Sequence, residues 1–260
     1  SIHFGGGVLR PPSVRRHGEV TKMVLVWLET ASFLSWVVKD FSWVLLIPET
    51  AWVGLLCALI FESWDIQNHW KVADRYDLAG RVVLLLWILG NGTWMTSELL
   101  YENPSKNITF PWFQGALLGP RTYVDQELKV LAGSFWALGL LLGLAAQMLG
   151  RRQGERALRS RLNADLWVIF WVLKDFFWLL ALPWNALACS VVIFYCLIDL
   201  RPSSEPKVLT AALISWLCGN TVWLVGELFL ADASVLPRVL TCVCLACSFC
   251  LGIKNFFEEQ

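Results

Sequence analysis

Apolar residues in this chain are gathered into eight long stretches that short polar segments separate. Each stretch has about the 17–25 residues that a helix needs to cross the hydrocarbon core of a bilayer. None of them alternates apolar and polar positions as a half-buried strand does, so the pattern predicts helices. The predicted spans are Trp27–Ile47, Pro48–Trp64, Gly80–Leu100, Leu128–Gly150, Ala164–Leu182, Pro183–Leu200, Val208–Leu230 and Pro237–Phe257.

Two of the predicted turns between spans are very short and carry a proline, Pro48 in one and Pro183 in the other. Proline fits the first turn of a helix, because its missing N–H would be unpaired there in any case. The alternative is that residues 27–64 and 164–200 each form one long buried helix. Both stretches exceed the thickness of a bilayer and both carry proline at the same place, which favours two helical hairpins.

The composition agrees with this pattern. Of the 260 residues 57% are hydrophobic and 16% are charged, and 16 are tryptophan, whereas soluble domains have about 45–50% apolar and about 25% charged residues. There is no glycine period, polar tract or basic stripe, which excludes collagen, disordered and nucleic-acid-binding classes. The prediction is an all-α polytopic membrane protein with eight transmembrane helices.

Basic residues between the predicted spans fall mainly on one side of the membrane. With eight crossings, 15 of the 21 Lys and Arg residues lie on the side of the N-terminus and four on the other side. The positive-inside rule then places both termini in the cytosol, matrix or stroma. The Arg-rich, acid-poor segment 1–22 favours an organelle membrane, an inner or thylakoid membrane. On the opposite side, the Pro- and aromatic-rich loop 101–127 is expected to lie in the membrane interface.

Two motifs occur twice, in the same order. The motif WxxKDFxW lies at Trp36–Trp43 and again at Trp171–Trp178, and the motif WxxGNxxWxxxEL lies at Trp87–Leu99 and again at Trp216–Leu228. Each half of the chain therefore holds one copy of each motif and four predicted spans. Because four is an even number of crossings, the two halves are predicted to be parallel four-helix repeats. The predicted parts are a basic tail (1–22), a first repeat (23–150), a basic connector (151–163) and a second repeat (164–260).

Charged side chains in the motifs are predicted to lie near the middle of the membrane. Lys39 and Asp40 come about nine residues before Pro48, which at 1.5 Å per residue is roughly 12–14 Å below the surface. A charge at that depth costs about 2.5–3.5 kcal/mol, so it needs a partner. The predicted intramembrane polar cluster is Lys39, Asp40, Asn91, Glu98, Lys174, Asp175, Asn220 and Glu227.

Helical spacing predicts how this cluster is neutralised. Within each motif the Trp and polar positions recur every three or four residues, so they share one helix face. We expect the two motif faces of each repeat to meet, with lysine paired to glutamate and aspartate accepting from asparagine or from an indole N–H. Gly90 and Gly219 would allow close helix approach. The aromatic residues expected to line the cluster are Trp36, Trp43, Trp87, Trp94, Trp171, Trp178, Trp216 and Trp223.

Several kinds of chemistry remain open for these residues. The cluster can hold helices together, or it can form an ion, proton or solute pathway; pigment ligation through Glu and Asn is a third alternative. All three histidines lie outside the predicted spans, which disfavours His-ligated haem or chlorophyll. Cys244 and Cys247 form a C-x-x-C without a nearby His or acid, so we predict no metal site. No nucleophile elbow, zinc-protease motif, P-loop or dinucleotide fingerprint occurs, so we predict no enzyme.

The order of the motifs resembles that of a group of small, uncharacterised bacterial membrane proteins. In those proteins a K-D-x-x-W helix is followed by a later A-N-x-x-W-M-x-G-E-F helix. Here Gly90 and Gly219 stand in place of the alanine. The two residues before Glu98 are Thr-Ser, where the bacterial pattern has x-Gly before its glutamate. The resemblance leaves out the flanking spans Leu128–Gly150 and Pro237–Phe257. It implies that the two motif helices pair, and it implies no activity.

These observations together predict a non-catalytic integral membrane protein. The expected role is an accessory or structural subunit of a larger respiratory or photosynthetic complex, and the alternative is a small ion, proton or solute transporter or channel. No cofactor is predicted. The expected partners are membrane lipids and other membrane-protein subunits, and no nucleic acid.

Overall fold

The computed structural model describes residues 12–70, 75–102, 121–152, 166–200, 207–230 and 235–258, and all regular structure in these residues is helical. The π-helical segments η1 (Glu98–Glu102) and η2 (Cys196–Leu200) extend α3 and α7. The all-α prediction is confirmed. The α-helices are α1 (Pro12–Val44), α2 (Pro48–His69), α3 (Arg75–Ser97), α4 (Arg121–Arg152), α6 (Leu166–Leu179), α7 (Pro183–Tyr195), α8 (Lys207–Leu228) and α9 (Val235–Glu258).

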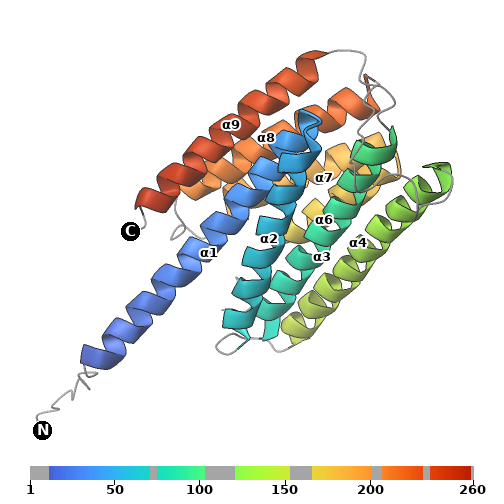
Figure 1. Cartoon of the computed structure of the whole chain (residues 1–260). Coiled ribbons are helices and arrows are strands. Elements are labelled where there is room, and N and C mark those ends of the chain that lie inside the picture. The colour runs from blue at the N-terminus through green and yellow to red at the C-terminus, as the bar shows by residue number, and fades with distance from the viewer. Residues whose placement is uncertain are drawn as a thin grey trace, which may run out of the picture.

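The helices form one bundle (Figure 1). The contacts between them show that inner and outer helices alternate. Helices α1, α3, α6 and α8 carry the repeated motifs and lie inside. Each outer helix packs against two inner ones: α2 against α1 and α3, α4 against α3 and α6, α7 against α6 and α8, and α9 against α8 and α1. The contacts of α4 with α6 and of α9 with α1 join the first half of the chain to the second on both sides.

The hairpin turns at Pro48 and Pro183 have the same geometry. In the first, the N–H of Ile47 donates to the carbonyl of Ser42 at 2.8 Å, and Leu46 has a φ of 55°. In the second, Ala181 has a φ of 51° at the equivalent position before the proline. This backbone is that of a Schellman motif, in which the residue with positive φ is usually glycine. Because Leu46 and Ala181 have a Cβ where glycine has none, each turn carries backbone strain of about 1–2 kcal/mol.

Replacing Ala181 with glycine is expected to stabilise the protein by about 1 kcal/mol, because glycine adopts positive φ without a steric penalty. Ala181 is exposed, so little packing is lost. The control is Ala188→Gly, an exposed position inside α7, where glycine should instead cost about 1 kcal/mol. The measurement is thermal unfolding of the purified protein in detergent. Equal shifts in both variants would contradict the strain.

Four of the helices are long and apolar enough to cross a membrane: residues 78–100, 125–148, 207–228 and 235–258. They correspond to four of the eight predicted spans. The other four helices are too short or carry too many charged residues over the length of a span. Helix α2 carries Glu49, Glu62 and Asp65, α1 carries the Lys–Asp pair, and the 14 residues of α6 rise only about 21 Å.

Some predicted boundaries differ from the structure. Helix α1 begins at Pro12, inside the predicted basic tail 1–22, so the first helix has 33 residues and is about 50 Å long. Most of the predicted interfacial loop lies outside the described residues, and so does most of the predicted connector 151–163. Helix α4 begins at Arg121, which places the end of the predicted loop in a helix.

Candidate functional site

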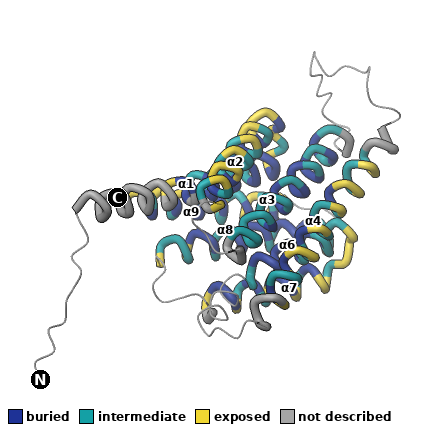
Figure 2. Tube along the Cα trace, turned by 90° about the horizontal axis from the view of Figure 1, so that it is seen from below, coloured by how far each residue is buried: buried dark blue, intermediate teal, exposed yellow. Residues whose placement is uncertain are grey.

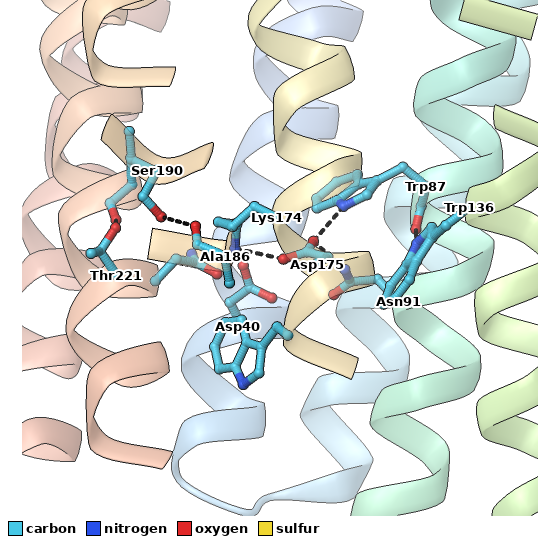
Figure 3. Close-up of polar contacts among 12 residues, drawn as sticks. Asp40, Trp87, Asn91, Trp136, Lys174, Asp175, Ala186, Ser190 and Thr221 are labelled. Carbon is cyan, nitrogen blue, oxygen red and sulfur yellow. Dashed lines mark hydrogen bonds and ion pairs between the residues drawn. The ribbon is translucent and has the colours of Figure 1, made fainter. Parts of the chain in front are cut away.

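Charged residues of the two copies of the first motif are buried in the bundle, and Asp40, Lys174 and Asp175 lie near one another (Figure 3). Lys39 and Asp40 on α1 are 1% and 3% exposed, and Lys174 and Asp175 on α6 are 0% and 3% exposed. With Asn91 on α3 and Asn220 on α8, they form what we call the polar layer. Burial of four ionised groups is tolerated only when they neutralise one another and their hydrogen bonds are made.

Each lysine pairs with the aspartate that follows it in the chain. Lys39 Nζ contacts Asp40 Oδ1, and it also donates to Asn91 Oδ1 at 2.9 Å. Lys174 Nζ lies 2.5 Å from Asp175 Oδ1. The ammonium groups also face indole rings, 5.0 Å from the ring centroid of Trp43 for Lys39 and 4.9 Å from that of Trp178 for Lys174, in cation–π geometry.

The second oxygen of each aspartate is held by the other half of the chain. Trp87 Nε1 and Asn91 Nδ2, both on α3, donate to Asp175 Oδ2 at 2.6 and 2.9 Å. Trp216 Nε1, on α8, donates to Asp40 Oδ2 at 2.7 Å. Each aspartate accepts from an indole, and Asp175 also accepts from an asparagine, so the donors are of the expected kind, but the expected contact within each repeat is wrong. The donors, however, come from the opposite half, so the polar residues form one shared layer instead of two separate clusters.

The glutamates bind indoles instead of the lysines. Glu98 Oε2 accepts from Trp43 Nε1 at 2.9 Å, and Glu227 Oε2 accepts from Trp178 Nε1 at 2.9 Å. Trp223 Nε1 donates to the other oxygen of Glu227. The expected pairing of lysine with glutamate is therefore wrong, because each lysine is already neutralised by the adjacent aspartate.

Tryptophans close the polar layer on the glutamate side. The second tryptophans of the four motif copies contact one another in a closed ring, with centroid distances of 4.8–5.4 Å and interplanar angles of 80–88°. Edge-to-face contact of this kind is favourable, because the positive edge of one ring meets the negative face of the next. We call it the upper ring; it consists of Trp43, Trp94, Trp178 and Trp223.

A second ring lies on the opposite side of the polar layer. Its neighbours are less regular: Trp171 and Trp216 stack with centroids 4.3 Å apart, while the other adjacent pairs are 5.4–6.3 Å apart. All eight tryptophans of the two rings are buried. These are the same eight tryptophans that the motifs single out in the sequence. We call this the lower ring; it consists of Trp36, Trp87, Trp171 and Trp216.

The two asparagines are equivalent in sequence but differ in their contacts. Asn91 bridges the halves, since its oxygen accepts from Lys39 and its nitrogen donates to Asp175. Asn220 Nδ2 instead donates to the carbonyl of Trp216, four residues earlier on its own helix, at 3.2 Å. The polar layer is therefore asymmetric, and Asn91 is the residue through which the two ion pairs are connected.

Glycine allows the close helix contacts that the motif predicts. A Cβ on Gly90 would lie 2.3 Å from Trp136 Nε1 on α4, whose indole donates to the carbonyl of Trp87 at 3.2 Å. A Cβ on Gly219 would lie 3.1 Å from Cys244 Cβ on α9. Both glycines thus face an outer helix while the next residue, an asparagine, faces the polar layer.

Replacing Gly90 with alanine is expected to destabilise the protein by about 1–3 kcal/mol, because the added methyl group overlaps the buried Trp136 ring. The matched control is Gly80→Ala on the same helix, where a Cβ meets nothing within 4 Å. That variant should gain up to about 1 kcal/mol from the higher helix propensity of alanine. Thermal unfolding in detergent measures both, and a Gly90 variant as stable as the Gly80 variant would contradict the close packing.

Sequence reasoning missed a second buried polar group between α1, α2 and α3. Arg81 Nη1 lies 2.8 Å from Asp65 Oδ2, and Ser32 Oγ donates to Glu62 Oε2 at 3.3 Å. Glu62 and Asp65 are each 1% exposed. The signal was available, since Glu62 and Asp65 are three residues apart and so lie on one face of α2. The same positions in the second half hold leucines, so these acids are not part of the repeated motifs.

No group of His, Cys, Asp and Glu in the described residues is arranged to hold a metal ion. Comparison of the chain with known protein families, with curated proteins and with solved structures finds no match. The resemblance to small bacterial membrane proteins stays a prediction. The polar layer and its tryptophan rings are therefore the features that bear on function.

Proposed function

We propose that all eight helices cross the bilayer, as two parallel repeats of four. The outer helices support this, because each has several exposed positions that hold large apolar residues; Figure 2 shows exposed positions along the bundle. This includes α2 and α7, whose hydropathy or length falls short of a span. The exposed residues that support it are Val53, Leu56, Ile60 and Trp64 on α2, and Trp184, Val191, Tyr195 and Ile198 on α7 and η2.

The acids of α2 explain why its mean hydropathy understates its fit to lipid. Glu62 and Asp65 point inward and are paired or hydrogen-bonded, so the lipid-facing surface of the helix carries neither charge. Membrane proteins place ionisable residues toward the bundle interior in this way. With eight crossings, the basic loops would place both termini on the cytosolic, matrix or stromal side, and we keep an organelle membrane as the proposed location.

For its role, we propose a non-catalytic accessory or structural subunit of a larger membrane assembly. The observation that carries this is the closed polar layer: four charges at most 3% exposed, paired with one another and covered by tryptophan rings. Such a layer fixes the order and register of the helices at a cost in desolvation. Lys39, Asp40, Asn91 and Asp175 are each held by at least two polar contacts, which suits a rigid element better than a conducting path.

Native gel electrophoresis of membranes solubilised in mild detergent tests this role, with mass spectrometry of the bands. We expect the chain to migrate in a complex larger than its own 29.5 kDa, with its partners in fixed stoichiometry. A harsh detergent applied to the same membranes is the control that should release the chain alone. Migration as the single chain under all mild conditions would contradict the subunit role.

A transporter or channel is the second candidate, and one observation favours it. In the proposed eight-span arrangement, the ion pairs between the two halves of the chain would lie at the interface of parallel repeats near mid-membrane, which is where transporters built from repeats place their sites. Purified protein in liposomes would then move protons or a small ion, and Asp175→Asn would abolish the flux while Glu258→Gln, at an exposed position in α9, would not. Absence of flux for protons, sodium, potassium and chloride would argue against this candidate.

A further inference from the structure

The two asparagines of the polar layer lie at equivalent places, because α8 lies against α6 in the same register as α3 lies against α1. In both halves, the second tryptophan of the WxxKDFxW motif donates to the glutamate of the other motif at 2.9 Å. In both halves, the first tryptophans of the two motifs are also in ring contact, 5.4 Å apart in one half and 4.3 Å apart in the other. Between these two contacts, Asn91 and Asn220 are each level with the lysine of their own half.

The second half nevertheless lacks two hydrogen bonds that the first half makes. Asn91 accepts from the lysine of its own half and donates to the aspartate of the other half. The equivalent partners of Asn220 are Lys174 and Asp40, and it bonds to neither. Among the described residues, Lys174 Nζ has an ionic contact with Asp175 but no acceptor in hydrogen-bond geometry. One acceptor and one donor are therefore missing, and a single carboxamide at this place supplies both.

Asn220 is bound instead to the backbone of its own helix. A peptide carbonyl has two lone pairs, and the N–H four residues later in the helix takes one of them. On Trp216 the second is taken by Asn220 Nδ2 at 3.2 Å. On Trp87 it is taken by the indole of Trp136 from the outer helix α4, also at 3.2 Å. The outer helix of the second half, α9, has no tryptophan, so Asn220 has a resting position that Asn91 does not have.

We propose that Asn220 is a latch with two positions. In the open position, which the structure shows, its amide rests on the Trp216 carbonyl. In the closed position its oxygen accepts from Lys174 and its nitrogen donates to Asp40, so that the two halves of the chain are linked twice. Closing exchanges one neutral hydrogen bond for two that involve charged groups, and hydrogen bonds of that kind are stronger. Asn91 is the permanent link and Asn220 the reversible one.

Helix α9 is the element that resists closing, because it is tied to α8 by hydrogen bonds from both sides. Ser215 on α8 donates to a carbonyl of α9 at 2.8 Å. Thr241 and Ser248 on α9 donate to carbonyls of α8 at 3.1 and 2.8 Å. A shift of α8 toward the polar layer therefore carries α9, which also packs against α1. The latch thus connects the position of an outer helix with the bonding of the bundle core. It requires only contacts within this chain, so it does not depend on the proposed subunit role.

The test uses the full chain in detergent, labelled with ¹⁵N, and nuclear Overhauser cross-peaks between side-chain amides and indole N–H groups. Asn91 and Trp87 donate to the same aspartate oxygen, so their protons lie close together and give the reference cross-peak. The closed latch brings Asn220 and the Trp216 indole to one oxygen of Asp40 in the same way. In the open position that amide lies against the backbone of Trp216, while the indole is directed at Asp40.

We expect a cross-peak between the Asn220 amide and the Trp216 indole that is weaker than the reference, because part of the molecules are closed. The Asn220 Nδ2 signal should also be split or broadened by exchange between the two positions, and that of Asn91 should not. A cross-peak that is absent, or as strong as the reference, overturns the proposal, because the side chain then keeps one position. Absence of the reference cross-peak overturns it as well, since Asn91 is then not the permanent link.

Trp136→Phe tests why the two asparagines differ. It frees the second lone pair of the Trp87 carbonyl and keeps an aromatic ring beside it, so Asn91 gains a resting position and the reference cross-peak should weaken. Trp184→Phe, at an exposed position of α7, should leave it unchanged. A reference cross-peak of full strength in Trp136→Phe would overturn the assignment of the two positions. The first comparison uses the unsubstituted chain, so it decides the proposal even if this variant fails to fold.

Discussion

Replacing Asp175 with asparagine is expected to cost about 3–5 kcal/mol of folding free energy, because it leaves the Lys174 ammonium buried without a counter-ion. The lysine is 0% exposed and lies between the Trp171 and Trp178 rings. Cation–π contacts of about 1–2 kcal/mol do not replace a carboxylate at 2.5 Å. Thermal or denaturant unfolding of the purified protein in detergent measures the loss.

The double variant Lys174→Met, Asp175→Asn tests whether the unpaired charge is the cause. Methionine fills the space of the lysine stem, and the asparagine carbonyl can still accept from Trp87. The double variant should recover most of the stability that the single variant loses. The matched control is Glu258→Gln, which breaks the exposed Lys254–Glu258 pair of α9 and should cost almost nothing, as exposed pairs contribute about 0–1 kcal/mol. Equal losses in the single and double variants would show that charge neutralisation is not what Asp175 supplies.

The sequence predicted the helices and their two hairpins because these depend on local features. Apolar length and proline position set where the hairpins at Pro48 and Pro183 turn, and the structure has both. The repeated motifs also predicted which side chains lie inside, since a charge in lipid must face other protein. Gly90 and Gly219 were recognised for the same reason: a small residue at a fixed place in a buried motif indicates close packing.

The pairing within the polar layer was not predictable from spacing. Helical periodicity tells which residues share a face, but it does not tell which face lies opposite. Motif faces of parallel repeats can meet within a repeat or between repeats, and both arrangements satisfy the same pattern. Lys39 and Asp40 are also adjacent in sequence, and neighbours on a helix point about 100° apart. The long lysine stem bends across this angle and reaches the aspartate. The rule that pairs residues i, i+3 and i, i+4 does not include such an i, i+1 contact.

Separating the chain between residues 157 and 158 is expected to yield two halves that are stable only together. Each half alone keeps a Lys–Asp pair but loses the indole from the other half that holds the second aspartate oxygen. Each half alone also holds only two of the four tryptophans of each ring, because α1 and α3 supply two members and α6 and α8 supply the other two. We expect co-expressed halves to co-purify through a tag on either one, and a half expressed alone to aggregate or be degraded.

A variant of one half shows whether the polar layer drives this association. Trp216→Phe removes the N–H that Asp40 accepts at 2.7 Å and keeps an aromatic ring in place. Because hydrogen bonds to charged groups are worth about 1.5–3 kcal/mol, the halves should associate roughly ten- to a hundredfold more weakly. Trp184→Phe in the same half, at an exposed site on α7, should leave association unchanged. The contrary result is that each half alone unfolds cooperatively and binds the other half no better than a control membrane protein. Each half would then be a complete folding unit, and the shared polar layer would not be needed for assembly.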